Sequence, residues 1–277
     1  MATPIGNLGD ITLRALETLA GVDVIACEDT RITRRLTERY AIAAELTPYH
    51  EHNAAQARPK ILQKLAQGAS VALVSDAGTP LISDPGFKLV REASSAGFAV
   101  TAVPGPSSVL TALSVAALPT DRFFFEGFLP SKAHARRARL VELARIDATL
   151  VLFESGNRVQ ETLADLAAIM GARDAAICRE LTKVHEEIRR AAVAELAKAA
   201  DVLETRGEFV LVIGPPASDA QAMGKDELDD LLRLRLASDS VKDAVAHAVE
   251  LSGRPRREVY TRALELAKEL RGEDGED

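Results

Sequence analysis

The feature that most constrains the fold is a strand-like apolar run that stops abruptly in a loop of small residues. Residues 71–80 read VALVSDAGTP, a run of β-formers followed by one carboxylate, a glycine and a proline. Similar exits occur at residues 98–108, FAVTAVPGPSS, and at 149–157, TLVLFESGN. A chain that leaves buried parallel strands in this way builds a ligand crevice at their carboxyl ends. Three such exits predict one shared small-molecule site.

Apolar runs alternate with helix-like segments along the chain, which predicts an α/β architecture with mainly parallel strands in the first half. The expected strands are 22–26, 69–74, 98–103, 123–127, 149–153, 175–178 and 209–213. The expected helices are 10–20, 53–66, 85–96, 107–116, 135–146, 157–170 and 192–204. Turn formers near residues 118–120 and 214–219 predict an α/β domain over 1–118, a second over 119–219 and a helical domain over 226–271.

The helical tail contains two good helix patterns, 240–251 and 255–270, joined by Ser-Gly-Arg at 252–254. A helix, a glycine-centred turn and an arginine-studded second helix are typical of a helix-turn-helix. A simple helical hairpin that caps the core has the same spacing. Both interpretations stay open on the sequence alone.

Composition narrows the class of protein. The 277 residues carry a formal net charge of −7 and two cysteines, Cys27 and Cys178. Each cysteine lies in an apolar run without a Cys or His neighbour, so we expect buried thiols rather than a disulfide or a metal site. No motif has metal-ligand spacing. The chain shows neither a run of about 18 apolar residues nor a leader peptide, so we expect a cytoplasmic protein without a membrane span.

Positive charge gathers in two segments although the net charge is negative. Residues 30–39 hold Arg31, Arg34, Arg35 and Arg39, and residues 131–145 hold Lys132, Arg136, Arg137, Arg139 and Arg145. Both segments are candidate phosphate-facing surfaces, and both have the alternative of a solvated helix face. Aromatic residues are sparse and Trp is absent, which argues against a base-stacking platform for single strands.

The sequence shows no dinucleotide-binding fingerprint, phosphate loop or legible Ser/His/Asp arrangement. Carboxylates do stand at the ends of expected strands: Glu28, Asp29, Asp76, Asp84, Glu126, Glu154 and Glu180. Such a group can accept a proton from a hydroxyl or hydrogen-bond a ligand, but it can equally cap the next helix. Asp29 and Asp84 both precede helix-like segments, so each is as well suited to be a helix cap as a catalytic group. Asp76 is the first candidate for a catalytic carboxylate and Glu28 the second.

Several motifs together resemble a known family. They are TPIGNLGDIT, CEDTR, LVSDAGTPLISDPG, PGPSS, FEGFLP, CRELTK and GEFVLVI, in this order and spacing. They closely resemble the bacterial small-subunit ribosomal RNA methyltransferases that 2′-O-methylate a cytidine of 16S rRNA, within the tetrapyrrole methylase superfamily. The resemblance runs from Thr3 to beyond Tyr260 and includes the helical tail.

The resemblance implies a fold and a cofactor. The fold is two α/β domains of the class III methyltransferase type with S-adenosylmethionine in the cleft between them, in a homodimer. The implied cofactor-binding residues are Pro4, Gly78, Thr79, Pro80, Ile82, Pro104, Ser107, Ser108, Phe153, Leu181 and Phe209. Thr79 stands where relatives in the superfamily carry the Asp of a Gly-Asp-Pro loop, so the backbone is expected to matter more than this side chain.

The implied reaction is methylation of a ribose hydroxyl in 16S rRNA of the small ribosomal subunit, and it requires no metal. The residues expected to contact RNA are Arg31, Arg34, Arg35, Lys132, Arg136, Arg137, Arg139, Arg256 and Arg257. One alternative is methylation of a tetrapyrrole-type small molecule, although such a substrate favours an apolar trough over Arg and Lys. Another is a helix-turn-helix regulator whose α/β body senses a metabolite.

The N-terminus departs from the family pattern. Relatives carry a short apolar strand immediately before the TPIGN-like motif, whereas here Met1 and Ala2 directly precede Thr3. A strand at that place would be central and buried on both faces. We therefore expect the natural start to lie upstream, and a chain of the given length to be less stable and weaker in cofactor binding.

Overall fold

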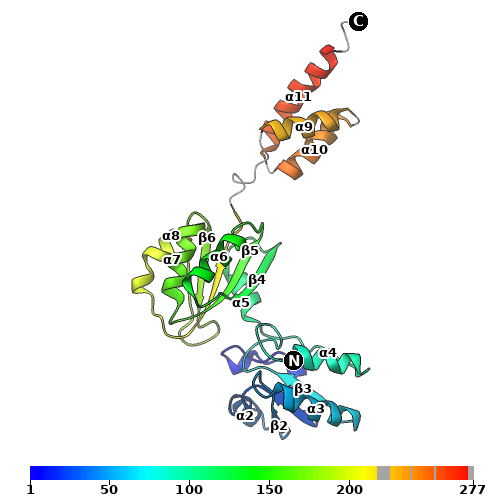
Figure 1. Ribbon diagram of the computed structural model, residues 1–277, viewed down its shortest axis with the longest axis vertical. Coiled ribbons are helices and arrows are strands. Elements are labelled where there is room, and N and C mark those ends of the chain that lie inside the picture. The colour runs from blue at the N-terminus through cyan, green and yellow to red at the C-terminus, as the bar shows by residue number, and fades with distance from the viewer. Residues whose placement is uncertain (217–224, 238, 253, 274–277) are drawn as a thin grey trace. The chain divides into compact units, whose positions relative to one another are not determined.

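The computed structural model describes residues 1–216, 225–237, 239–252 and 254–273, and it divides into two compact units, Met1–Pro215 and Pro216–Asp277 (Figure 1). The first part of the first unit contains η1 (Leu8–Asp10), α1 (Leu13–Gly21), β1 (Val24–Cys27), α2 (Thr30–Arg39), β2 (Glu45–Pro48), α3 (Ala54–Ala66), β3 (Val71–Val74), α4 (Phe87–Ser95) and α5 (Ser108–Ala116). Its second part contains β4 (Phe123–Phe128), α6 (Ala133–Leu143), β5 (Thr149–Ser155), α7 (Val159–Met170), β6 (Asp174–Arg179), β7 (Glu187–Ala192), α8 (Val193–Lys198), η2 (Ala200–Val202) and β8 (Glu208–Ile213).

The first sheet is parallel, with strand order β2-β1-β3. All four residues of the central strand β1 are buried, so the strand reads as a continuous apolar run. Ile25 packs on one face, in a cluster with Leu19 of α1 and Leu36 of α2. Ala26 faces the other side, in a cluster with Ile61 of α3 and Leu89 of α4. Helices therefore cover both faces of this sheet, and the loops at its carboxyl edge carry the polar residues.

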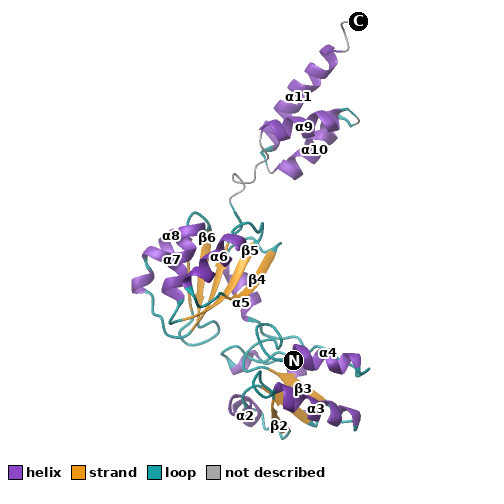
Figure 2. Cartoon of the chain, in the orientation of Figure 1, coloured by secondary structure: helices purple, strands orange, loops and turns teal. Residues whose placement is uncertain are grey.

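The second sheet, of which β4, β5 and β6 are labelled in Figure 2, has the order β4-β5-β8-β6-β7. Strands β4 and β5 are parallel and the remaining neighbours are antiparallel. Its residues alternate between two clusters. Leu150 and Leu152 pack in the cluster that contains the apolar residues of α6, α7 and α8, whereas Val151 packs in the cluster of α5. Helix α5 precedes the domain boundary expected at residue 118, yet it packs against this second sheet.

The strand expected at 98–103 does not form. Strand β3 pairs only with β1 among the described strands, and an apolar groove of about 850 Å³ on its other side is lined by Val71, Leu73 and residues 98–103. The first two residues make one hydrogen bond to each side of this groove. The Met1 ammonium donates to Leu73 O of β3 at 2.9 Å, and Ala2 N donates to Val103 O at 3.1 Å. Without a further strand in this groove, residues 98–103 have no ladder to join.

Two strands and a helix boundary were not predicted. Strand β2 reads ELTP and β7 reads EIRRAA, and both are half-exposed edge strands without an apolar run. The helix expected at 192–204 is shorter, because α8 ends at Lys198 and a 3₁₀ turn, η2, follows. Edge strands with charged side chains resist detection by hydrophobic pattern alone.

The second unit contains α9 (Lys225–Leu236), α10 (Val241–Ser252) and α11 (Arg256–Glu273). A small core joins the three helices through residues such as Leu232, Val245 and Val259. Asp229 of α9 accepts two hydrogen bonds from Arg262 of α11, which ties the first helix to the third. Helix α9 was not predicted, and residues 217–219 and 253 of the expected turns lie outside the described residues. In the described parts of the chain, no helix combines the length and apolar character needed to cross a membrane.

Candidate active site

A cavity of about 340 Å³ lies in the first unit where the loops after both sheets meet. Most of the residues that the resemblance assigns to the cofactor line it: Gly78, Thr79, Ile82, Ser107, Ser108, Phe153, Leu181 and Phe209. Three of them come from the loop after β3 and two from the start of α5, and the others come from β5, the loop after β6, and β8. The structure thus brings together residues that are more than a hundred positions apart in the chain.

Three prolines of the same predicted set do not line this cavity. Pro80 and Pro104 line the apolar groove beside β3. Pro4 is buried, and its neighbour Ile5 lines the cavity in its place. Ile5 and Thr79, which adjoin Pro4 and Pro80 in the chain, form part of the cavity wall instead.

Gly78 lines the cavity, but its backbone N–H and carbonyl are not open to a ligand. Its N–H donates to Thr3 O at 3.1 Å and its carbonyl accepts from Thr3 N at 2.9 Å, so both groups are already paired. A positive φ of 76° favours glycine here, and a Cβ would lie 3.3 Å from Cγ2 of Ile5. Thr79 Oγ1 donates to Pro106 O at 3.3 Å and links the two cavity loops. Gly78 therefore keeps the loop close to the N-terminal segment.

Free backbone donors lie at the start of α5 instead. Ser107 is the N-cap residue of this helix, and its side chain makes no capping hydrogen bond. The first amides of a helix have no intrahelical acceptor, and the helix dipole adds partial positive charge there. Because Ser107, Ser108 and Val109 line the cavity, these donors are available to an anionic group of a ligand.

The two predicted catalytic carboxylates, Asp76 and Glu28, lie close together but do not line this cavity. Asp76 Oδ1 accepts a hydrogen bond from Asp29 N at 2.8 Å, and Glu28 accepts one from the backbone N–H of Asp76. The ends of β1 and β3 are thereby joined in both directions. Burial raises the pKa of both carboxyls, and the negative charge of Asp76 raises the pKa of Glu28 further.

Asp29 and Asp84 differ in role, although the sequence left both as caps or catalysts. Asp29 is the N-cap of α2 and accepts from Arg31 N at 2.8 Å. Hydrogen bonds from Arg31 lower its pKa to about 2. Asp84 is not a cap, because α4 begins after Gly86, and it lines the cavity. Burial raises the pKa of Asp84, a hydrogen bond with Ser75 opposes this shift, and the charge of Asp76 adds to it.

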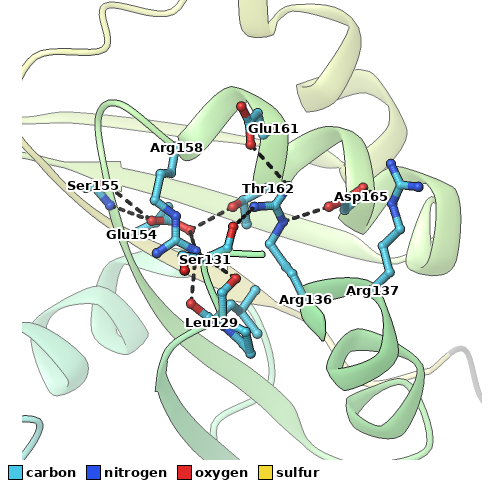
Figure 3. A network of polar contacts seen from close by, with 11 residues as sticks. Leu129, Ser131, Arg136, Arg137, Glu154, Ser155, Arg158, Glu161, Thr162 and Asp165 are labelled. Atoms are coloured by element: carbon cyan, nitrogen blue, oxygen red, sulfur yellow. Dashed lines mark hydrogen bonds and ion pairs between the residues drawn. The ribbon is translucent and has the colours of Figure 1, made fainter. Parts of the chain in front are cut away.

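A third carboxylate, Glu154, lines the cavity from β5 and is held rigidly (Figure 3). It is 2% exposed, and it accepts hydrogen bonds from Thr162 Oγ1 at 2.7 Å and from Ser155 N at 2.8 Å. Arg158 lies 3.5 Å from it and also donates to Leu129 O at 2.9 Å. The cavity wall is thus tied to the loop that connects β4 and α6.

Some of the predicted RNA-contacting residues are exposed without an ion pair in the described structure, and others form ion pairs with carboxylates. Arg34, Arg35 and Lys132 are exposed, and their side chains form no ion pair within the described residues. Arg31 is exposed but paired with Asp29, and Arg139 binds Glu126 and Glu142. In the second unit, Arg256 and Arg257 are exposed.

The prediction that Arg136 faces RNA is wrong. Its side chain is buried, donates from Nε to Asp165 at 2.7 Å, and pairs with Glu161 at 3.3 Å (Figure 3). Arg137 holds the other oxygen of Asp165 at 2.6 Å, while most of its side chain remains exposed. Together the two hydrogen bonds outweigh the burial of Asp165 and lower its pKa. A run of arginines on a helix does not reveal which of them points inward.

Comparison with known proteins identifies the chain's relatives. Residues 2–197 match the family described as Tetrapyrrole (Corrin/Porphyrin) Methylases, and residues 222–267 match the RsmI C-terminal HTH domain. A protein of Mesorhizobium japonicum called Ribosomal RNA small subunit methyltransferase I is 48% identical over 99% of this chain and 92% of its own length. A protein of the same name from Xylella fastidiosa is 46% identical over 94% of this chain and 96% of its own length. The chain belongs to the ribosomal RNA small subunit methyltransferase I family.

Family membership settles several expectations. The predicted α/β methylase fold with a helix-turn-helix tail is confirmed, and the hairpin alternative for the tail is set aside. A solved structure with the same fold is uroporphyrin-III C-methyl transferase from Thermus thermophilus complexed with S-adenyl homocysteine. It is 20% identical over 76% of this chain and 93% of its own length, with a TM-score of 0.51. Among the described residues, no group of three or more His, Cys, Asp and Glu is arranged to hold a metal ion.

Proposed function

We propose that this chain transfers a methyl group from S-adenosylmethionine to the 2′-oxygen of a cytidine ribose in 16S rRNA of the small ribosomal subunit. The relatives' shared name supports a small-subunit rRNA substrate. The observation that carries the chemistry is a cavity in which an apolar wall, the amides of a helix start and one carboxylate without a cation meet.

The residues of the cavity fit the cofactor. When bound, S-adenosylmethionine supplies an electrophilic methyl group on a cationic sulfur. Ile5, Leu181 and Phe209 are buried and offer an apolar surface to an adenosine. The first-turn amides of α5 are suited to the cofactor's carboxylate. The neighbouring carboxylates favour a cationic group in the same cavity.

We infer that Asp84 accepts the proton of the attacking hydroxyl. Of the carboxylates that line the cavity, Glu154 pairs with Arg158 and Glu208 pairs with Lys183. Asp84 forms no ion pair with any described residue, so its charge is available to a substrate. The raised pKa of this half-buried carboxyl makes it a stronger base than an exposed Asp.

Asp76 and Glu28 do not line the cavity, so we place them after Asp84 as candidates for the proton acceptor. Oδ1 of Asp76 already accepts from the backbone of Asp29, and the charge of Asp76 raises the pKa of Asp84. We therefore assign Asp76 as a positioning residue and Glu28 as its partner at the end of β1.

The exposed basic residues supply phosphate contacts. Lys132 stands at the start of α6, and Arg34 and Arg35 are exposed on α2. Folded RNA is recognised largely through shape and phosphate contacts, which such residues provide without reading sequence. The proposal extends to a homodimer in the cytoplasm, as the family resemblance implies, and light scattering of the purified protein measures the oligomeric state.

The decisive experiment offers labelled S-adenosylmethionine and small subunits that lack the modification to the purified protein. We expect label in 16S rRNA, and mapping by mass spectrometry should place it on the ribose of a cytidine. Label on a base, or transfer only to a tetrapyrrole acceptor, would contradict the proposed substrate. Absence of transfer together with specific DNA binding would favour the regulator alternative.

A further inference from the structure

We propose that Phe128 is the stacking surface for the nucleobase of the target nucleotide. The proposal rests on the proposed function and adds to it a subsite for the base. It concerns the end of β4, where the strand FFFEGF leaves the sheet beside the cavity.

A β-bulge aims Phe128 toward the cavity. Phe125 pairs with Val151, and Phe128 pairs with Phe153, two positions further along β5. Three residues of β4 therefore span the same distance as two of β5, so both phenylalanines lie on one face of the sheet. Gly127 adopts a φ of 76° at this bulge. In a regular strand, side chains 125 and 128 would point to opposite faces.

Contacts on both faces agree with this geometry. Phe153 makes edge contacts with Phe125, at 4.9 Å between ring centroids, and with Phe128, at 5.6 Å. Glu126, between them, turns the other way and binds Arg139 of α6 at 2.7 Å. Phe128 is thus held by its edge contact with Phe153 and yet is 56% exposed.

Exposure separates this ring from the wall that suits the cofactor. Ile5, Leu181 and Phe209 are buried, whereas Phe128 and Ile82, which is 45% exposed, line the same cavity at positions open to solvent. An exposed aromatic face beside a cavity offers a base the contact that it loses when it leaves a stack. Lys132, four residues after Phe128, is exposed and available to a phosphate of the same strand.

The small number of aromatic residues in the sequence argued against a base-stacking platform. The chain has eight phenylalanines and no tryptophan, yet Phe125, Phe128 and Phe153 gather at one site. The β-bulge and the parallel pairing of β4 with β5 assemble this cluster, and neither feature is visible in composition. The cluster gives a role to an exposed aromatic side chain that packing alone does not require.

The test compares Phe128→Ala, Phe128→Leu and Phe128→Trp with wild type. The readouts are single-turnover methylation of undermethylated small subunits and cofactor affinity by calorimetry. Loss of base stacking should raise the half-saturating concentration of small subunits about 5- to 150-fold in the Ala variant. The Leu variant, which keeps apolar volume without a ring, should show most of this loss, and the Trp variant should stay within about threefold of wild type. Cofactor affinity should not change.

Phe87→Ala is the matched control, because Phe87 is 61% exposed on α4 and does not line the cavity. We expect wild-type behaviour from it. A Phe128→Ala protein that loses cofactor affinity to the same degree as methylation would assign the ring to the cofactor and overturn the proposal. Wild-type saturation in all three Phe128 variants would overturn it as well. Failure of the wild-type protein itself to methylate small subunits would refute the proposed function instead.

Discussion

Asp76 accepts a hydrogen bond from the backbone N–H of Asp29 at 2.8 Å, so a carboxylate at the end of β3 holds the start of α2. This bond favours the charged form of Asp76, but burial dominates and raises its pKa. The charge of Asp29 raises it further, while that of Arg31 lowers it.

The first prediction concerns pH and stability. A carboxyl whose pKa is raised on folding binds its proton more tightly in the folded state, so its contribution to stability decreases as pH rises through that pKa. Asp76→Asn stays neutral and keeps an oxygen for Asp29 N–H. We therefore expect the difference in unfolding free energy, variant minus wild type, to increase between about pH 4 and pH 7. Urea denaturation at several pH values measures it, and parallel curves for the two proteins would contradict the assignment.

The second prediction concerns the proton acceptor. Asp84→Asn should lower the single-turnover rate by a factor on the order of 10² to 10⁴, with cofactor affinity retained. The wild-type rate should rise with pH above the ordinary Asp value of 3.8, because burial raises the pKa of Asp84, and this limb should vanish in the variant. Asp76→Asn serves as the comparison and should lose less than about tenfold. Near wild-type turnover in Asp84→Asn would remove it from the reaction.

The third prediction concerns Gly78. Gly78→Val places a β-branched residue at a positive φ and beside Ile5, so the loop must shift. Such strain costs about 1–3 kcal/mol, and we expect cofactor affinity to fall roughly tenfold or more by calorimetry. Gly68→Val is the control, since Gly68 has a φ of 89° with open space around it and does not line the cavity. Equal cofactor affinity in both variants would argue against a site at Gly78.

The fourth prediction separates surface charge from buried charge. Lys132→Glu should reduce the slope of log affinity for small subunits against log salt by at least about 0.7 to 0.9. Lys60→Glu, the same charge change on an exposed residue of α3, controls for net charge. Arg136→Met should keep the slope but lose stability on the order of 3 kcal/mol, because one side of buried Asp165 loses its partner. A slope unchanged by Lys132→Glu would mean that Lys132 is an ordinary solvated residue.

The fifth prediction concerns the groove beside β3. An apolar extension of about ten residues ahead of Met1 supplies a strand of 5 to 6 residues and its entry. It should raise the melting temperature and cofactor affinity, because it covers Val71 and Leu73 and gives residues 98–103 a neighbour. A polar extension of equal length is the control. Equal melting temperatures for all three proteins would show that the groove does not accept a strand.

The sequence was informative where burial and local chemistry agree. The apolar runs at β1, β5 and β8 are buried throughout most of their length. Phe153 of β5 lines the cavity, and the loop after β3 brings Gly78 to the same cavity. It was less informative where structure depends on partners far along the chain. Residues 98–103 look like a strand but pair with no strand of the described chain, and Val103 O accepts a single bond from Ala2 N. Arg136 looks like its exposed neighbours but faces Asp165. The sequence could not show that Asp84 lines the cavity, because a carboxylate just before a helix can equally be a helix cap.

The bulge in β4 makes the length of this strand as important as its composition. Removing one residue between Phe125 and Phe128 would restore regular alternation and leave the ring on the face of Phe125, whereas adding one residue there would turn the ring toward the α6 face of the sheet. Adding one residue would shift the following loop, including Lys132, relative to the cavity. We therefore expect a scan of single-residue insertions to find β4 intolerant at sites where many substitutions are accepted. In evolution, such a segment can exchange its amino acids more easily than it can gain a residue.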